Sequence, residues 1–233
     1  MTGASGGVGR AIVLALAGEG VRVHLVGRRA EALGDVAGQV GGTAPRPLVH
    51  RADLSHDAEI TQLVARIQRE VRTIDILVHA AGIISLGRVD RAPMEEFDRQ
   101  FAINVRAAYA VSQGFLPMLK ASQGQIVFLN SSAGLSGRAG SSQYAATKHA
   151  LRGIADSLRE EVNGEGVRVL SVFLGRTATP MQAAIHQAED RAYEPERLIR
   201  PEDVASIVIS ALRLPRSIEV TDMTLRPLQK PGS

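Results

Sequence analysis

The sequence has 233 residues and no cysteine, which excludes disulfide scaffolds, cysteine-ligated metal centres and thiol nucleophiles. Hydrophobic residues make up 45% and charged residues 22% of the chain, as in ordinary globular proteins. The net charge is only +3, the arginines are scattered and aromatic residues make up 3%, so the composition disfavours nucleic-acid binding. No apolar run is long enough to predict a membrane span, and the first residues lack a signal-peptide pattern. We therefore expect a cytoplasmic protein without a metal site.

Short apolar runs rich in Val, Ile and Leu alternate along the chain with longer amphipathic segments. The predicted strands are residues 21–26, 47–50, 74–79, 125–130, 167–173 and 219–225. The predicted helices are residues 8–19, 57–71, 94–111, 142–162 and 202–212. This alternation predicts an α/β fold with a doubly wound parallel sheet and helices on both of its faces. Since no repeat, linker or composition break interrupts the chain, we expect a single domain over residues 1–233.

A glycine-rich turn lies at the start of the chain, directly before the first predicted helix. Gly3, Gly7 and Gly9 have the spacing Gly-x-x-x-Gly-x-Gly, with Ser5 and Val8 between them. Glycines let the backbone approach a pyrophosphate closely, and the free N–H groups at a helix start attract its charge. The turn is therefore a candidate dinucleotide-binding site, and the competing interpretation is a plain glycine turn.

The strand that normally precedes such a turn is not found in the sequence. A dinucleotide-binding turn follows a strand, and in a doubly wound sheet that strand is central. Here the turn itself begins at Thr2. We therefore expect either that the first strand is missing or that the true start lies upstream of Met1.

A second candidate site combines a serine, a tyrosine and a lysine. Tyr144 and Lys148 are four residues apart and share a face of the predicted helix 142–162. An ammonium beside a phenol favours the phenolate, so we expect Lys148 to lower the pKa of Tyr144. Ser131 follows the predicted strand 125–130, at the carboxyl edge where ligands bind in open α/β sheets. Its hydroxyl could hold a carbonyl oxygen beside the phenol.

With these motifs, essentially the whole chain resembles the short-chain dehydrogenase/reductase family, in its short single-domain branch. The resemblance implies a Rossmann-like fold and a hydride transfer between NADPH and a carbonyl carbon. It implies that Tyr144 transfers a proton, that Ser131 orients the substrate oxygen and that Lys148 also binds the nicotinamide ribose. It further implies that Asn104 completes a catalytic tetrad by holding a water that links Lys148 to solvent.

The resemblance also assigns cofactor contacts along the rest of the chain. The turn residues Gly3, Ser5, Gly7, Val8 and Gly9 belong to this set, as do Asp53, Leu54, Ala80, Ala81, Gly82, Gly175, Thr177 and Thr179. Asp53 and Leu54 correspond to an adenine-contacting pair, and Thr179 to a contact with the nicotinamide carboxamide. His79 replaces the asparagine that the family has before Ala80. We expect His79 to make a structural hydrogen bond between strands rather than a catalytic contact.

The residues after the predicted strand 21–26 bear on the choice of nicotinamide cofactor. An acidic residue there would bind the ribose hydroxyls and favour NAD, whereas an arginine accommodates a 2′-phosphate. This sequence has Arg28 and Arg29 at that point. Guanidinium groups make bidentate contacts with phosphate, so we predict NADP, with NAD as the second candidate and Arg28 as the stronger ligand.

The substrate is constrained only to a small molecule with a carbonyl or alcohol group. In the family it is shaped by the segment after the strand that corresponds to 167–173, here about residues 176–195, by the loop 85–92 and by residues near 135–140. The family also implies a homodimer or homotetramer that pairs through the predicted helices 94–111 and 142–162. Two alternatives remain: a non-catalytic cofactor-binding regulator or partner of the same fold, and a sugar-nucleotide epimerase or dehydratase. Those last relatives usually carry a longer C-terminal domain.

Overall fold

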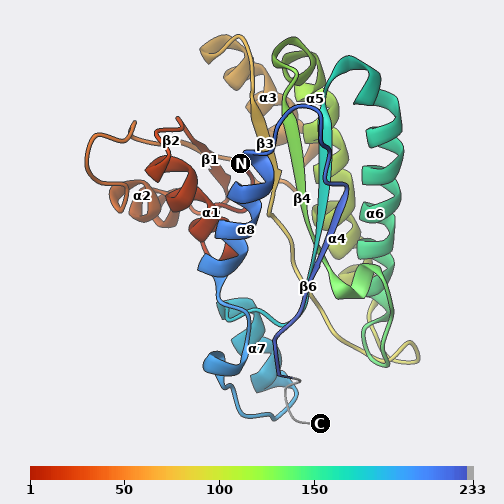
Figure 1. Cartoon of the computed structure of the whole chain (residues 1–233). Coiled ribbons are helices and arrows are strands. Elements are labelled where there is room, and N and C mark those ends of the chain that lie inside the picture. Colours follow the sequence, from red (N-terminus) through yellow and green to blue (C-terminus); the bar gives the residue numbers. More distant parts are fainter. Residues whose placement is uncertain (230–233) are drawn as a thin grey trace. The chain divides into compact units, whose positions relative to one another are not determined.

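The computed structural model describes residues 1–229 as an α/β protein (Figure 1). Its residues group into two compact units. Unit 1 contains residues 1–51, 174–216 and those from Thr224 onward, and unit 2 contains residues 52–173 and 217–223. The strands form a two-stranded sheet, β1–β2, and a four-stranded sheet in the order β3–β4–β5–β6. No helix in the described part of the chain is long and apolar enough to cross a membrane.

Unit 1 is built on two parallel strands, β1 (His24–Gly27) and β2 (Leu48–Arg51). Its helices are α1 (Gly7–Gly18), α2 (Ala30–Gly38), α7 (Pro180–Ala188) and α8 (Pro201–Leu212). Helix α1 packs along α8, and Ile12, Leu16 and Val208 are among the apolar side chains buried in these helices. Figure 1 shows α1 and α8 side by side. Helix α2 covers the strand pair through contacts with both β1 and β2.

The first residues of the chain replace a full strand with a single point of pairing. Thr2 forms an isolated parallel bridge with Val26, and the Met1 carbonyl accepts a hydrogen bond from the Val26 N–H at 2.9 Å. Among the described residues, no longer strand precedes the glycine turn. The pairing nevertheless places the turn directly beside the end of β1.

Unit 2 holds β3 (Ile76–His79), β4 (Gln125–Ser131) and most of β5 (Arg168–Leu174), while β6 (Asp222–Leu225) begins within it. Its helices are α3 (Asp57–Glu70), α4 (Met94–Phe101), α5 (Ala107–Ser122) and α6 (Ser142–Val162). Strands β3 and β4 pair in parallel. Helix α5 packs against both α3 and α6, as Figure 1 shows. The core is apolar, with Phe128, Phe173 and Ile126 fully buried.

The predicted helix 94–111 differs most from the structure. Helix α4 passes at Ala102–Arg106 into one turn of π-helix and continues as α5, which extends to Ser122 although it contains Pro117. Buried side chains on α5, such as Phe115 and Leu119, carry its apolar stripe past the proline. Tertiary packing therefore offsets the hydrogen bond that a proline removes from a helix.

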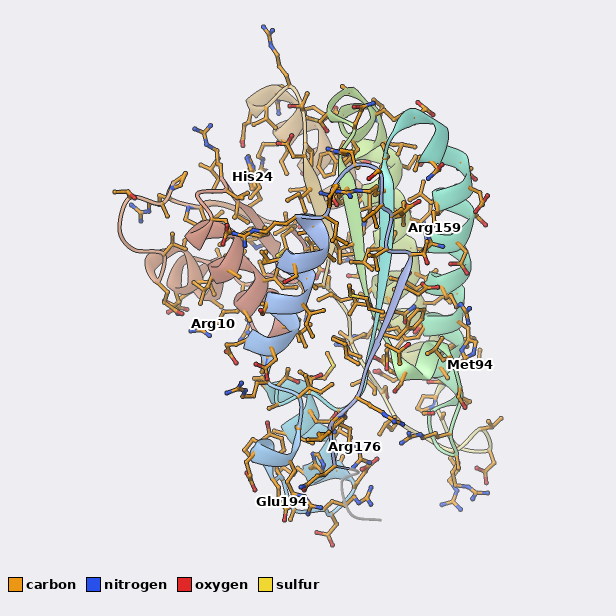
Figure 2. The ribbon with its side chains drawn as sticks, in the orientation of Figure 1. Arg10, His24, Met94, Arg159, Arg176 and Glu194 are labelled. Atoms are coloured by element: carbon orange, nitrogen blue, oxygen red, sulfur yellow. The ribbon has the colours of Figure 1, made fainter. Side chains whose placement is uncertain are left out.

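Arg159 of α6 is a buried guanidinium that fastens the helix to the sheet (labelled in Figure 2). Its Nε donates to the Val169 carbonyl at 3.0 Å, and its Nη2 donates to the Thr221 carbonyl at 3.1 Å. Nη1 donates to the Asp156 carboxylate at 3.0 Å. Because these bonds satisfy the donors, the charge is buried with partners rather than alone.

We expect Gly114→Ala to destabilise the protein because Gly114 lets α5 approach α3 closely. A Cβ at Gly114 would lie 2.7 Å from Val64 Cγ2 of α3. Overpacking of this kind costs about 1–3 kcal/mol, measurable by chemical denaturation. Gly153→Ala in α6 is the control, because its Cβ would meet nothing within 4 Å. This control should gain about 0.5–1 kcal/mol. Equal effects of the two substitutions would contradict the packing argument.

Candidate active site

The glycine turn of unit 1 has a backbone that only glycine adopts easily. Gly3 has φ 65° and Gly7 has φ 51°, both in the left-handed region. A Cβ at Gly9 would lie 2.1 Å from the Gly3 carbonyl oxygen. Ser5 is half-buried in the turn, and Val8 is buried in the first turn of α1. The sequence therefore needs these glycines to begin α1 directly behind the turn, with the N–H groups of the helix start close to it.

Three predicted cofactor residues that follow β5, namely Gly175, Thr177 and Thr179, also lie in unit 1, and Thr179 lies against the turn. A Cβ at Gly7 would lie 3.1 Å from Thr179 Cγ2. The Thr179 hydroxyl caps α7 by accepting from the Gln182 N–H at 3.2 Å. Thr177 is buried and donates its hydroxyl to the Gly175 carbonyl at 3.1 Å. The fold thus brings Thr179 to the glycine turn, although the two are far apart in the sequence.

Arg28 and Arg29 follow β1 at the same edge of unit 1 as the turn. Both are exposed, and within the described chain neither makes a side-chain hydrogen bond or an ion pair. Arg29 is the residue before α2. Two free guanidinium groups are therefore available to a phosphate at this edge.

In unit 2, the predicted serine and tyrosine are in contact. Ser131 ends β4 and Tyr144 lies in the first turn of α6. The Ser131 hydroxyl lies close enough to the Tyr144 phenol to act on its pKa, which it lowers. Ser131 Oγ also accepts from the Ala133 N–H at 3.1 Å, which fixes its position. The tertiary structure thus selects Ser131 rather than Ser132 as the partner of Tyr144.

Lys148 is buried beneath Tyr144, one helical turn further along α6. Its Nζ lies 5.8 Å from the centre of the Tyr144 ring and donates to the Leu129 carbonyl at 3.3 Å. Burial lowers the pKa of the Lys148 ammonium to about 8. Because a single carbonyl is a weak replacement for water, this lysine releases its proton more easily than an exposed one.

The prediction that Lys148 lowers the pKa of Tyr144 is wrong, because the pKa of Tyr144 is raised. Burial raises the pKa of Tyr144, and the hydrogen bond from Ser131 opposes this only in part. The ammonium lies against the ring face, and desolvation of the phenol outweighs the attraction that the sequence argument relied on. In this state Tyr144 is therefore a protonated phenol, which is the form that donates a proton.

Asn104 lies in the π-helical turn, where both N–H groups of its carboxamide have partners and its Oδ1 accepts one hydrogen bond. Oδ1 accepts from the Ile83 N–H at 2.8 Å, and Nδ2 donates to the Ile83 carbonyl at 2.9 Å and to Thr147 Oγ1 at 3.0 Å. A Cβ at Gly82 would lie 3.3 Å from Asn104 Oδ1 and 3.7 Å from Lys148 Nζ. Gly82, Asn104 and Lys148 therefore meet, while the role of Asn104 in holding a water stays a prediction.

The other predicted contacts of unit 2 lie near the ends of β2 and β3. The Asp53 carboxylate accepts from the Ser55 N–H at 3.0 Å and from its hydroxyl at 2.7 Å. Leu54 is buried. Ala80 and Ala81 are half-buried and directly follow β3. Their contacts with a cofactor stay predictions.

His79 is a buried structural residue, but its hydrogen bond goes to a helix. Its Nε2 lies 2.8 Å from Ser112 Oγ of α5, and its ring stacks on Phe128 of the neighbouring strand at 4.8 Å. Burial lowers its pKa to about 3, so the imidazole is neutral at ordinary pH. The expected bond between strands is replaced by an aromatic contact between strands.

Sequence reasoning missed the polar residues that hold the candidate catalytic residues in place. Asn130 Nδ2 donates to the Lys148 carbonyl at 3.1 Å, and its Oδ1 accepts from the Ser131 N–H at 2.8 Å. Gln100 is fully buried; its Oε1 accepts from the Ser85 N–H at 3.0 Å and its Nε2 donates to Gln143 at 3.3 Å. The signal for Asn130 was a polar residue that ends an apolar strand, and no local pattern indicated Gln100.

The chain is similar to a known protein family and to several known proteins. A family model described as short chain dehydrogenase matches residues 1–190. An uncharacterized oxidoreductase of Staphylococcus saprophyticus is 30% identical over 98% of this chain and 96% of that protein. A glycine betaine reductase of Emericella nidulans is 30% identical over 99% of this chain, which corresponds to only 19% of that larger protein.

Solved structures resemble the chain over nearly its full length. A short chain dehydrogenase from Shigella flexneri, complexed with NADP, is 30% identical with a TM-score of 0.88, covering 96% of this chain and 94% of that one. The actinorhodin polyketide ketoreductase with NADPH is 25% identical with a TM-score of 0.87, covering 97% and 94%. The doubly wound α/β fold predicted from the sequence is thereby confirmed.

The buried position of Lys148 predicts an ammonium that titrates near pH 8 in the protein without ligand. The chain has only three lysines, so lysine-selective NMR can follow the side chains individually as the pH rises. A Lys148→Met variant assigns the signal, because the resonance that titrates near pH 8 should disappear from its spectrum. If the signal lost in this variant instead titrates at about 10.4, the value of a solvated lysine, the burial argument is wrong.

Proposed function

The chain belongs to the short chain dehydrogenase family, and on this premise we propose that it is an NADP-dependent oxidoreductase that interconverts a carbonyl group and a secondary alcohol. One observation carries the proposal: the Ser131 hydroxyl acts on the Tyr144 phenol, and the buried Lys148 lies over the ring of that tyrosine. A protonated phenol, an orienting hydroxyl and a nearby ammonium together form a proton donor for a carbonyl oxygen.

The residues of unit 1 fit a dinucleotide. The turn excludes a side chain at Gly9 and carries positive φ at Gly3 and Gly7, so bare backbone N–H groups are available to a pyrophosphate. Thr179 beside Gly7 would meet the nicotinamide carboxamide. NADPH, when bound, supplies the hydride that a carbonyl carbon accepts.

In the reduction direction, the protein's own groups handle the substrate oxygen. Ser131 Oγ orients this oxygen beside the Tyr144 hydroxyl, which donates its proton as the carbon–oxygen double bond becomes a single bond. Tyr144 is then a phenolate, and the Lys148 ammonium stabilises its negative charge. Oxidation of an alcohol is the same proton transfer in reverse. Lys148 would also bind the nicotinamide ribose, and Asn104 would hold a water that returns protons.

The preference for NADP rests on the edge beside β1. Arg28 and Arg29 are exposed without ion-pair partners within the described chain. Guanidinium groups form charge-assisted bonds with phosphate, which favours a ribose that carries a 2′-phosphate. The Shigella flexneri relative was solved with NADP and the ketoreductase with NADPH, which supports the same choice for this chain.

Two further proposals concern the organisation of the protein. We propose that residues 1–233 act as a single catalytic domain, which the family match over residues 1–190 supports because it includes parts of both units. We also propose a homodimer or homotetramer that pairs through α4, α5 and α6. Met94 and Phe101 on α4 expose 62% and 39% of their surfaces, and burying them would favour association.

A non-catalytic regulator is the second candidate, and the structure disfavours it. Burial of the Lys148 ammonium is unfavourable for the fold, because it lowers the pKa of that group to about 8. A regulator that only binds a cofactor needs neither this buried charge nor the contact between Ser131 and Tyr144. Perturbed groups gathered in this way are typical of catalytic sites.

We expect the protein to bind NADPH more tightly than NADH in a fluorescence titration, because Arg28 and Arg29 can bind the 2′-phosphate. Gly9→Ala should abolish the binding, because its Cβ would lie 2.1 Å from the Gly3 carbonyl oxygen. Gly18→Ala at the other end of α1 is the matched control, since its Cβ meets nothing within 4 Å. Tighter binding of NADH would contradict the NADP assignment, and a folded protein that binds neither would contradict the function.

Tyr144→Phe should abolish turnover while NADPH still binds, because only the proton donor is removed. General acid catalysis contributes roughly a factor of 10² to 10⁴ to rate, so oxidation of NADPH should slow at least a hundredfold. A panel of aldehydes and ketones, followed by NADPH absorbance, first identifies a substrate of the wild-type protein. The exposed Tyr109 on α5 gives the control variant, Tyr109→Phe. Normal turnover of the Tyr144 variant would exclude the mechanism.

A further inference from the structure

A third arginine lies at the edge of unit 1 where Arg28 and Arg29 lie. Strands β1 and β2 run parallel, and Arg51, the last residue of β2, is the register partner of Gly27, the last residue of β1. Carboxyl ends of parallel strands share one edge, and neighbouring strands are only about 4.8 Å apart. Arg51 is therefore one strand spacing from the point where Arg28 leaves β1.

The alternation of side chains along the strands determines the face on which Arg51 lies. The rings of His24 and His50 stack 5.1 Å apart on one face of the strand pair, and His24 is labelled in Figure 2. Arg51 follows His50 and so belongs to the opposite face. On that face Gly27 contributes no side chain, and the nearest atom to its Cβ position is Leu33 Cδ2 of α2 at 3.4 Å. No side chain at its register position on β1 therefore covers Arg51.

The charge of Arg51 has no counterion within the described chain. Its side chain is exposed, and it forms neither an ion pair nor a side-chain hydrogen bond. Some other exposed arginines have carboxylate partners: Arg106 pairs with Asp57, Arg197 with Glu194 and Arg213 with Glu19. Three unpaired guanidinium groups at one edge repel one another unless an anion lies among them.

We propose that Arg51 is a further specificity-determining residue, which binds the 2′-phosphate of NADPH together with Arg28. The inference rests on the proposed function, because it concerns the same cofactor. It adds a ligand that comes from β2, far along the chain from the segment after β1 that the sequence indicated. A phosphate between the two side chains would receive hydrogen bonds from two planar guanidinium groups, one directly after β1 and one at the end of β2. A ribose hydroxyl carries no negative charge and could not neutralise these two positive charges.

The test compares ligands with and without a 2′-phosphate by calorimetric titration. The probes are 2′,5′-ADP against 5′-ADP, and NADPH against NADH. We expect Arg51→Gln to weaken 2′,5′-ADP and NADPH about tenfold or more, as loss of a charge-assisted hydrogen bond does, and to leave 5′-ADP and NADH unchanged. Arg51→Lys should restore only part of the loss, since an ammonium cannot make the bidentate contact.

Arg46→Gln is the matched control. This substitution removes the same charge as Arg51→Gln. Arg46 is exposed and lies just before β2, at the end of that strand opposite to Arg51. Selective loss in the Arg51 variant alone supports the proposal. Wild-type affinities in the Arg51 variant, equal losses in both variants, or equal losses for all four probes would each overturn it.

The outcomes also separate this proposal from the proposed function. If the wild-type protein binds 2′,5′-ADP through Arg51 but never oxidises NADPH, the phosphate site is supported and the proposed oxidoreductase function is refuted. If the wild-type protein reduces carbonyls with NADPH but Arg51→Gln leaves all affinities unchanged, the proposed function is supported and the role of Arg51 is refuted.

Discussion

The close contact between the turn after β4 and helix α6 governs the chemistry of unit 2. A Cβ at Gly134 would lie 2.8 Å from both the Asn130 Oδ1 atom and the Lys148 carbonyl oxygen, so only glycine allows this approach. Asn130 closes the contact by bonding the Lys148 carbonyl and the Ser131 N–H with a single carboxamide. The end of the strand and the start of the helix are thereby held together, which brings the Ser131 and Tyr144 side chains into contact.

Burial that follows from this contact sets the protonation states of the site. It lowers the pKa of Lys148 to about 8 and raises that of Tyr144, so both groups are shifted towards their neutral forms. A neutral phenol is a proton donor, whereas a phenolate needs a nearby positive charge. In the proposed mechanism the protonated Tyr144 donates its proton, and the positive charge of Lys148 becomes important once that proton has left.

Unit 1 shows the opposite electrostatic arrangement. Its arginines at the carboxyl edge of β1 and β2 stay exposed and unpaired within the described residues, and the nearby turn presents backbone N–H groups rather than side chains. Both features attract anions, and neither stabilises the fold in their absence. In the proposed function the two units therefore have different roles: unit 1 offers positive charge for a phosphate-bearing ligand, and unit 2 offers a buried proton donor.

The sequence by itself determined the alternation of strands and helices, the glycine turn and the spacing of Ser131, Tyr144 and Lys148, because these are local patterns of periodicity and residue type. It did not determine where α5 ends, since buried contacts carry that helix past Pro117. Only the tertiary structure decided that Asn130 ties the site together, that burial outweighs Lys148 in setting the pKa of Tyr144, and that Arg51 lies beside Gly27. Each of these depends on residues that are distant in the chain but adjacent in space. A local sequence pattern does not show which distant residues come together.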